Sequence, residues 1–183
     1  MIDTVRGYAN AEPDEWEVTS GSSIVTYWSD EEIQRVLDRH KAEYVHAALE
    51  VQPTYSAGSI VYTQYRLGVT DVESGTAVFK VEDTAGTVSG YSVDYARGVV
   101  TFTADQSGKS FWWSGFAYDL NAAAADIWRM KASHVANLVD FSTDGHSVKR
   151  SQQAKQYLDM AGYYQNRSVS EGVTTAKIVR DDL

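Results

Sequence analysis

The sequence predicts an α+β fold: a small helical core of three main helices, an inserted antiparallel β sub-domain and extended termini. Three observations support this prediction. Apolar residues recur with a helical period after residue 29 and again after residue 119. The region between them, 54–118, holds most of the chain's 13 glycines, separated by stretches rich in β-branched and aromatic residues. The apolar fraction of 43% is enough for a core in a chain of 183 residues.

Residues 1–53 are expected to form an N-terminal arm followed by the first helix. Residues 1–27 lack a regular pattern, apart from "SIVTYW", which could be a short strand. The apolar period then predicts a helix over about 29–50. Its start is marked by Ser29 and Glu32, which have the spacing of a capping box. A proline shortly after the periodic stretch is expected to end the helix.

Residues 54–118 are predicted to form a small antiparallel sheet of about five strands, inserted between helical segments. Its last strand is the most aromatic. Because alternate residues of a strand face opposite sides, one side of this strand should join a core. The other side should be an exposed patch, either a subunit contact or a platform on which a sugar stacks. The candidate subunit-contact residues are Trp112, Trp113 and Phe116.

Residues 119–165 are predicted to be a helical hairpin that completes the helical core. Asp119 or Asn121 can cap its first helix, and the second helix is expected over about 148–165. The expected core residues on the apolar faces of the two helices are Trp128, Val135, Leu138 and Leu158.

The C-terminal tail, 166–183, lacks an amphipathic pattern and has too few apolar residues to fold alone. Its stretch "TTAKIV" nevertheless has the β-branched bias of a strand. The tail is therefore expected to be ordered by another protein chain, through strand addition or wrapping. The residues expected to bind that partner are Val173, Thr175, Ile178 and Val179.

The stretch "VDFSTDGHSVKRS", between the two predicted helices of the hairpin, places oxygen-bearing side chains where a calcium-binding loop has its first ligands. The residues of this corner are Asp140, Ser142, Asp144, Gly145 and Ser147. The twelfth position of such a loop needs a bidentate Glu, and here it is Ser151. We therefore expect a metal-free structural corner in which Gly145 adopts positive φ and Ser147 caps the next helix.

Composition and motifs argue against several classes of function. There is no cysteine, so disulfides, thiolate nucleophiles and Cys-based zinc sites are excluded. The formal charge of −9 disfavours non-specific binding to DNA or anionic membranes, and no apolar run is long enough to cross a bilayer. No nucleotide-binding, hydrolase or zinc-protease motif is present. His40 and His134 are expected to be structural, and Asp119 and Asp126 to be a cap and a solvated surface residue.

The chain resembles the head-to-tail connector (adaptor) proteins of tailed bacteriophages. Four stretches carry the resemblance, over about 1–50 and 116–165: "VRGYANAEPDEWE", "YWSDEEIQRVLDRH", "YDLNAAAADIWRMKASHVANLVDFSTDG" and "HSVKRSQQAKQYLDMAGYY". They combine an Ala-rich helix with an internal Trp, an Asp-Phe-Ser turn, a small Asp-Gly loop and a helix that starts near Arg-Ser-Gln.

The resemblance implies a structural virion protein of the neck without enzyme activity or cofactor, assembled in the host cytoplasm. Such proteins form closed rings, commonly of twelve subunits. The implied partners are copies of itself, the portal protein and tail or stopper proteins, while genomic DNA passes through the ring without specific binding. The β region departs from the all-helical pattern of the family. The alternative function is a carbohydrate- or protein-binding β module carried on a helical scaffold, and an enzyme or metal protein is the third possibility considered.

Overall fold

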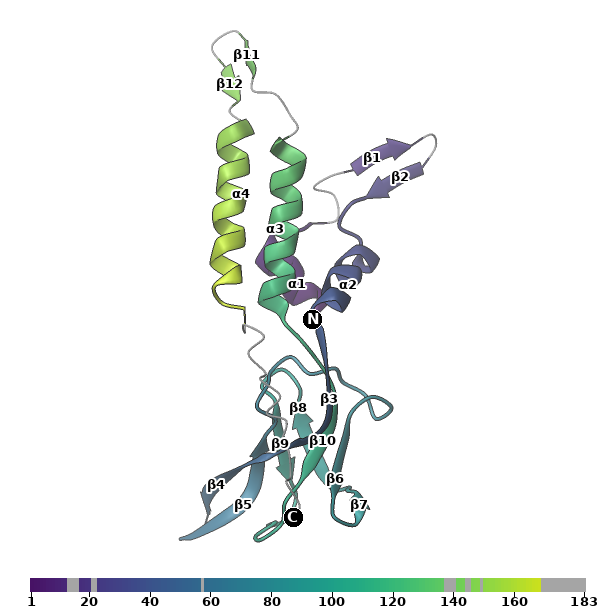
Figure 1. Ribbon diagram of the computed structural model, residues 1–183, viewed down its shortest axis with the longest axis vertical. Helices are drawn as coiled ribbons and strands as arrows, with labels where there is room; N and C mark the ends of the chain where they lie inside the picture. Colours follow the sequence, from purple (N-terminus) through teal and green to yellow (C-terminus); the bar gives the residue numbers. More distant parts are fainter. Residues whose placement is uncertain are drawn as a thin grey trace, which may run out of the picture.

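The computed structural model describes residues 1–12, 17–20, 23–56, 58–136, 141–143, 146–148 and 150–168. Its described residues contain four helices and two four-stranded antiparallel sheets, which confirms the predicted α+β class. The molecule is elongated, with the helices gathered at one end and the two larger sheets at the other (Figure 1). We refer to these two parts as the helical unit and the β-domain.

The helical unit is built around α3. Its helices are α1 (Ile2–Ala9), α2 (Asp30–Arg39), α3 (Leu120–Ala136) and α4 (Arg150–Gln165). α1, α2 and α4 all contact α3. The buried side chains that α1, α2 and α3 share include Val5, Ile33, Leu37, Ile127 and Trp28. Two short hairpins extend from this unit: β1 (Glu17–Ser20) with β2 (Ser23–Thr26), and β11 (Phe141–Thr143) with β12 (His146–Val148).

The β-domain consists of two sheets with the strand orders β3-β10-β6-β7 and β4-β5-β9-β8. Its strands are β3 (Lys41–Ala48), β4 (Glu50–Ser56), β5 (Ser59–Arg66), β6 (Lys80–Asp83), β7 (Gly86–Thr87), β8 (Tyr91–Asp94), β9 (Val99–Phe102) and β10 (Trp112–Tyr118). β3 and β4 are separated only by Leu49, so one stretch of chain passes from the first sheet into the second. The Leu49 amide donates to the Phe111 carbonyl (2.9 Å) at this corner. The sheets are therefore joined on one side by β3 and β4.

The prediction of about five strands within 54–118 is confirmed by β5, β6, β8, β9 and β10, but the prediction of one sheet is wrong, because these strands belong to two sheets. The predicted helix over 29–50 was right only for its first half. Ser29 does cap α2, since its hydroxyl oxygen accepts from the Glu32 amide (3.3 Å), but the helix ends at Arg39. The remainder is β3, which pairs with β10. The ring of Tyr44, a residue within the predicted helix, stacks on Trp113 with ring centroids 4.9 Å apart.

The N-terminal arm contains more structure than predicted. Residues expected to be irregular form α1, which places Val5 and Ala9 in the helical core. The suggested strand in "SIVTYW" is confirmed as β2, and its partner β1 was not predicted. Arg6 connects α1 to α2, because its guanidinium donates to the Trp28 carbonyl (2.9 Å) and to the Asp30 carboxylate (2.5 Å).

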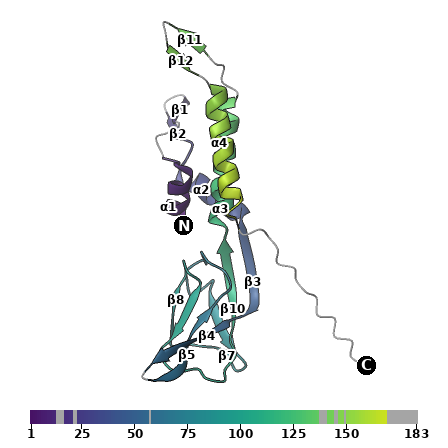
Figure 2. The ribbon, with the colours of Figure 1, turned by 90° about the vertical axis from the view of Figure 1, so that its left-hand side faces the viewer.

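The helical unit and the β-domain are linked by two antiparallel strands, β3 and β10, which run between them (Figures 1 and 2). Lys41 is paired with Tyr118, and the Asp119 amide donates to the His40 carbonyl (3.0 Å). The chain therefore leaves the helical unit and returns to it at adjacent points. This corrects the predicted start of the β sub-domain from residue 54 to residue 41, whereas its predicted end at 118 agrees with the end of β10.

Candidate functional site

α3 contacts the end of α1 through two side chains, Trp128 and Lys131. Trp128 is 8% exposed, and its indole N–H donates to the Tyr8 carbonyl at the end of α1 (3.2 Å). Lys131 is fully buried; its ammonium donates to the Asn10 carbonyl (2.7 Å) and lies 4.9 Å from the centre of the Trp128 ring. These bonds hold the end of α1 against α3. The prediction that Trp128 and Val135 belong to the core is confirmed, since Val135 is 3% exposed.

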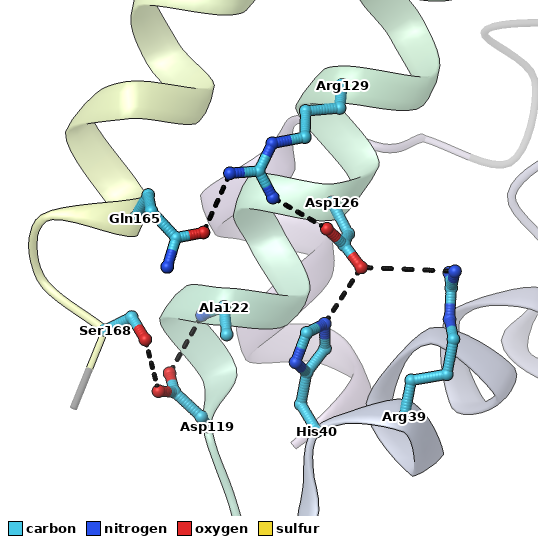
Figure 3. A network of polar contacts seen from close by, with 8 residues as sticks. All are labelled: Arg39, His40, Asp119, Ala122, Asp126, Arg129, Gln165 and Ser168. Atoms are coloured by element: carbon cyan, nitrogen blue, oxygen red, sulfur yellow. Dashed lines mark hydrogen bonds and ion pairs between the residues drawn. The ribbon is translucent and has the colours of Figure 1, made fainter. Parts of the chain in front are cut away.

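A network of charged residues lies where the helical unit meets the β-domain (Figure 3). The Asp126 carboxylate of α3 accepts from Arg129 (2.9 Å) and is bonded to the His40 ring nitrogen (2.9 Å). Arg39 approaches the same carboxylate at 4.0 Å. Arg129 also donates to the Gln165 side-chain oxygen at the end of α4 (2.8 Å). Asp126 therefore joins α2, α3 and, through Arg129, α4.

Asp119 makes a second connection at the same place. One of its oxygens accepts from the Ala122 amide (2.8 Å), which confirms the prediction that Asp119 can cap the first helix of the hairpin. Its other oxygen accepts from the Ser168 hydroxyl (2.7 Å). Figure 3 shows Asp119 at the foot of α3, facing the end of α4. The residue thus anchors the last described part of the chain beside β10.

The expectation that Asp126 is a solvated surface residue is wrong, because its side chain is only 23% exposed and is surrounded by cations. Burial alone would raise the pKa of Asp126, but the hydrogen bonds from His40 and Arg129 outweigh it and lower that pKa below its usual value. His40 is structural, as expected, in that it ties the start of β3 to α3. Both carboxylate oxygens of Asp126 are bonded to residues of the fold, so this network is suited to holding α2, α3 and α4 together.

α4 carries three large apolar side chains in contact with solvent, of which Met160 and Tyr163 lie on the side turned away from the buried Ala154 and Ala161. Leu158 is 55% exposed, Tyr163 50% and Met160 37%. The prediction that Leu158 belongs to the core is therefore wrong. The buried side of α4 is made by the small Ala154 and Ala161, and Leu158 lies at its border, roughly 50° around the helix from them.

The outer face of β10 carries two of the three predicted contact residues. Trp112 is half-buried and stacks on the His46 ring, with centroids 5.0 Å apart and planes 6° apart. Phe116 lies under the Lys41 ammonium, 4.0 Å from the ring centre. Trp113 points to the opposite face and is fully buried in the core of the β-domain. Trp113 is therefore a core residue and was wrongly assigned as a contact, as the alternation along the strand requires.

The predicted corner is a β-hairpin at the far end of the hairpin α3–α4 (Figure 1). Ser142 and Ser147 are paired across β11 and β12. The next helix, α4, begins at Arg150, and the side chain of Ser147, which was predicted to cap it, lies outside the described part of the chain. Asp140, Asp144 and Gly145 lie outside the described residues, as does Leu138. The four predicted partner-binding residues of the tail lie outside them too: Val173, Thr175, Ile178 and Val179.

Within the described part of the chain, no group of three or more His, Asp or Glu side chains is arranged to hold a metal ion. No described helix is long and apolar enough to cross a membrane.

Comparisons with known proteins leave the chain without an assigned family. No family model matches it, and neither a curated protein nor a solved structure matches it significantly.

Proposed function

We propose that the chain is a structural head-to-tail connector of a tailed bacteriophage, which forms a ring below the portal and extends the DNA channel. The observation that carries the proposal is the exposed apolar surface of α4. The helix packs on α3 along a face of small residues, while Leu158, Met160 and Tyr163 remain in contact with solvent. Apolar side chains of this size on one helix favour coverage by another subunit. The arrangement of the subunits as a ring is inferred from the sequence resemblance to connector proteins.

Shape and charge are compatible with this role. An elongated subunit can contact neighbours along its length while its ends point in opposite directions (Figure 1). The formal charge is −9 per chain. Twelve copies, the number common in the resembled family, would carry 12 × 9 = 108 formal negative charges. A ring with this charge would repel the phosphate backbone, so DNA could pass without being held.

The contribution of α4 to assembly is tested by Leu158→Arg, which places a charge in the proposed subunit interface. The matched control is Thr84→Arg, at an exposed position in the turn between β6 and β7, away from α4. Sedimentation velocity should show that the wild type and the control assemble and that Leu158→Arg remains a monomer. Unchanged far-UV circular dichroism in all three proteins would show that the subunit fold is intact. Equal assembly of the two variants would rule out α4 as the interface.

The second candidate function is a binding module formed by the β-domain. It is favoured by the stacked Trp112 and His46 rings, which lie on the solvent side of β10. The face of the half-buried Trp112 ring that His46 does not cover can stack on the apolar face of a sugar. Titration with bacterial surface oligosaccharides, followed by tryptophan fluorescence, would then give saturable binding that Trp112→Ala abolishes.

A further inference from the structure

The two sheets of the β-domain are joined on one side by β3 and β4. On the other side the chain passes from β7 to β8 through residues 88–90, and each of these two strands is the edge of its sheet. The direction of the backbone groups along β8 follows from one bond, in which the Thr103 amide donates to the Gly90 carbonyl (3.1 Å). Since such bonds alternate along an antiparallel pair, Ser92 and Asp94 bond to β9. Tyr91 and Val93 turn their amides and carbonyls away from β9, and none of the described residues bonds to these four groups.

A groove of about 420 Å³ runs along this open edge. It is lined by side chains of the β-domain core that are only partly covered here, including Val88, Tyr91, Val93 and Tyr95, and by the buried Phe79. The open edge therefore combines unpaired backbone groups with an incompletely covered core. A strand added beside β8 would form hydrogen bonds with those backbone groups and cover the core side chains.

The other edge strands of the β-domain carry features that disfavour pairing with another chain. β4 contains Pro53, which has no N–H to donate, at a shift in its register. β3 is interrupted by His46, whose φ is 53°. β7 has only two residues. β8 has no proline, bulge or residue with positive φ. Its one charged residue, Asp94, accepts a hydrogen bond from the Arg97 amide in the turn that follows the strand (3.1 Å).

The composition of the C-terminal tail matches what this edge would accept. Residues 174–179, "TTAKIV", are mostly β-branched and contain neither proline nor glycine. The last described residue of the tail is Ser168, which Asp119 holds beside the end of β10. The 15 residues that follow can span at most about 50 Å when extended. Figure 2 shows β8 and β10 on opposite sides of the β-domain, so the start of the tail and the open edge face different neighbours.

We propose that the β8 edge of one subunit accepts residues 174–179 of a second copy as an added strand. Each subunit then offers a tail on one side and an edge on the other, which links subunits head to tail. The proposal rests on the proposed function, because it supplies a contact between neighbouring subunits of the ring.

Disulfide trapping tests this directly, because the chain contains no cysteine. Ser92→Cys, on the exposed face of β8, is combined in turn with a single cysteine at each of residues 174–177. The matched control pairs the same tail cysteines with Glu43→Cys on the exposed edge strand β3. Mild oxidation should give covalent oligomers with Ser92→Cys at alternating tail positions, since residues two apart share a face, and only background with Glu43→Cys.

Cross-linking equal to that of the Glu43→Cys control would overturn the proposal. A fast-migrating cross-linked monomer would overturn it as well, by showing that the tail pairs with its own subunit. Electron microscopy of the same samples separates this result from the fate of the proposed function. Rings without the alternating cross-links would support the proposed connector function and contradict the strand exchange. Alternating oligomers without rings would support the strand exchange and count against the connector.

Discussion

Replacing Trp128 by alanine should be among the most destabilising changes in the helical unit. The side chain is 8% exposed, and a buried tryptophan removes about 150–250 Å² from water. At about 25 cal/mol per Å² this corresponds to roughly 4–6 kcal/mol of transfer free energy, and measured Trp→Ala losses in cores run at about 3–5 kcal/mol. The substitution also removes the bond to the Tyr8 carbonyl and the ring beside Lys131. We expect a loss of about 4–5 kcal/mol.

Two further variants separate packing from hydrogen bonding. Trp128→Phe keeps most of the apolar area but leaves the Tyr8 carbonyl without its donor, so it should cost only about 1–2 kcal/mol. Trp112→Ala serves as the control, because that ring is only half-buried and should contribute much less. The free energy of unfolding is measured by urea titration, with the helical signal at 222 nm as the readout. A Trp128→Ala protein within 1 kcal/mol of the wild type would refute the placement of this ring in the core.

Three other predictions concern the junction, the corner and the β-domain. Asp126→Asn should destabilise the protein at neutral pH, because a carboxylate with a lowered pKa stabilises the fold above its unfolded pKa and loses that effect on protonation. The difference in stability between this variant and the wild type should therefore shrink as pH falls below about 4. A difference that does not change with pH in thermal melts would contradict this. Calcium at micromolar concentration should leave the melting temperature unchanged, because position twelve of the corner is Ser151, and a rise of several degrees would reveal a site. Replacing residues 42–117 by a short Gly/Ser linker should preserve the helical circular dichroism, since Lys41 and Tyr118 are paired, and collapse of that signal would show that the β-domain is needed by the helices.

The sequence predicted the fold where local patterns and tertiary contacts agree. The hairpin α3–α4 has a helical period, a capping aspartate and a buried Trp128, and each was recognised. The second half of the predicted 29–50 helix failed for a physical reason. Residues 41–48 are rich in alanine and have good helix propensity, but pairing with β10 and the stacking of Tyr44 on Trp113 outweigh that local preference.

The Asp126 network could not have been predicted because its members are far apart in the sequence. His40 and Asp126 are 86 residues apart, and Arg129 and Gln165 are 36 apart. The helix α1 was missed because its eight residues include Gly7 and lack a capping side chain, so its stability comes from contacts of Val5 and Ala9 with the helical core. Strand alternation requires that Trp112 and Trp113 face opposite sides of β10, but which of the two is buried depends on the second sheet.

Electron microscopy of the purified full-length chain tests the central claim most directly. End-on views should show closed rings with a central channel, and their rotational symmetry should be close to twelvefold, as the resemblance to connector proteins implies. The exposed side chains of α4 should lie in the contacts between subunits of such a ring. Particles that remain single elongated subunits, both alone at high concentration and mixed with a portal, would contradict the proposal that this chain is a connector.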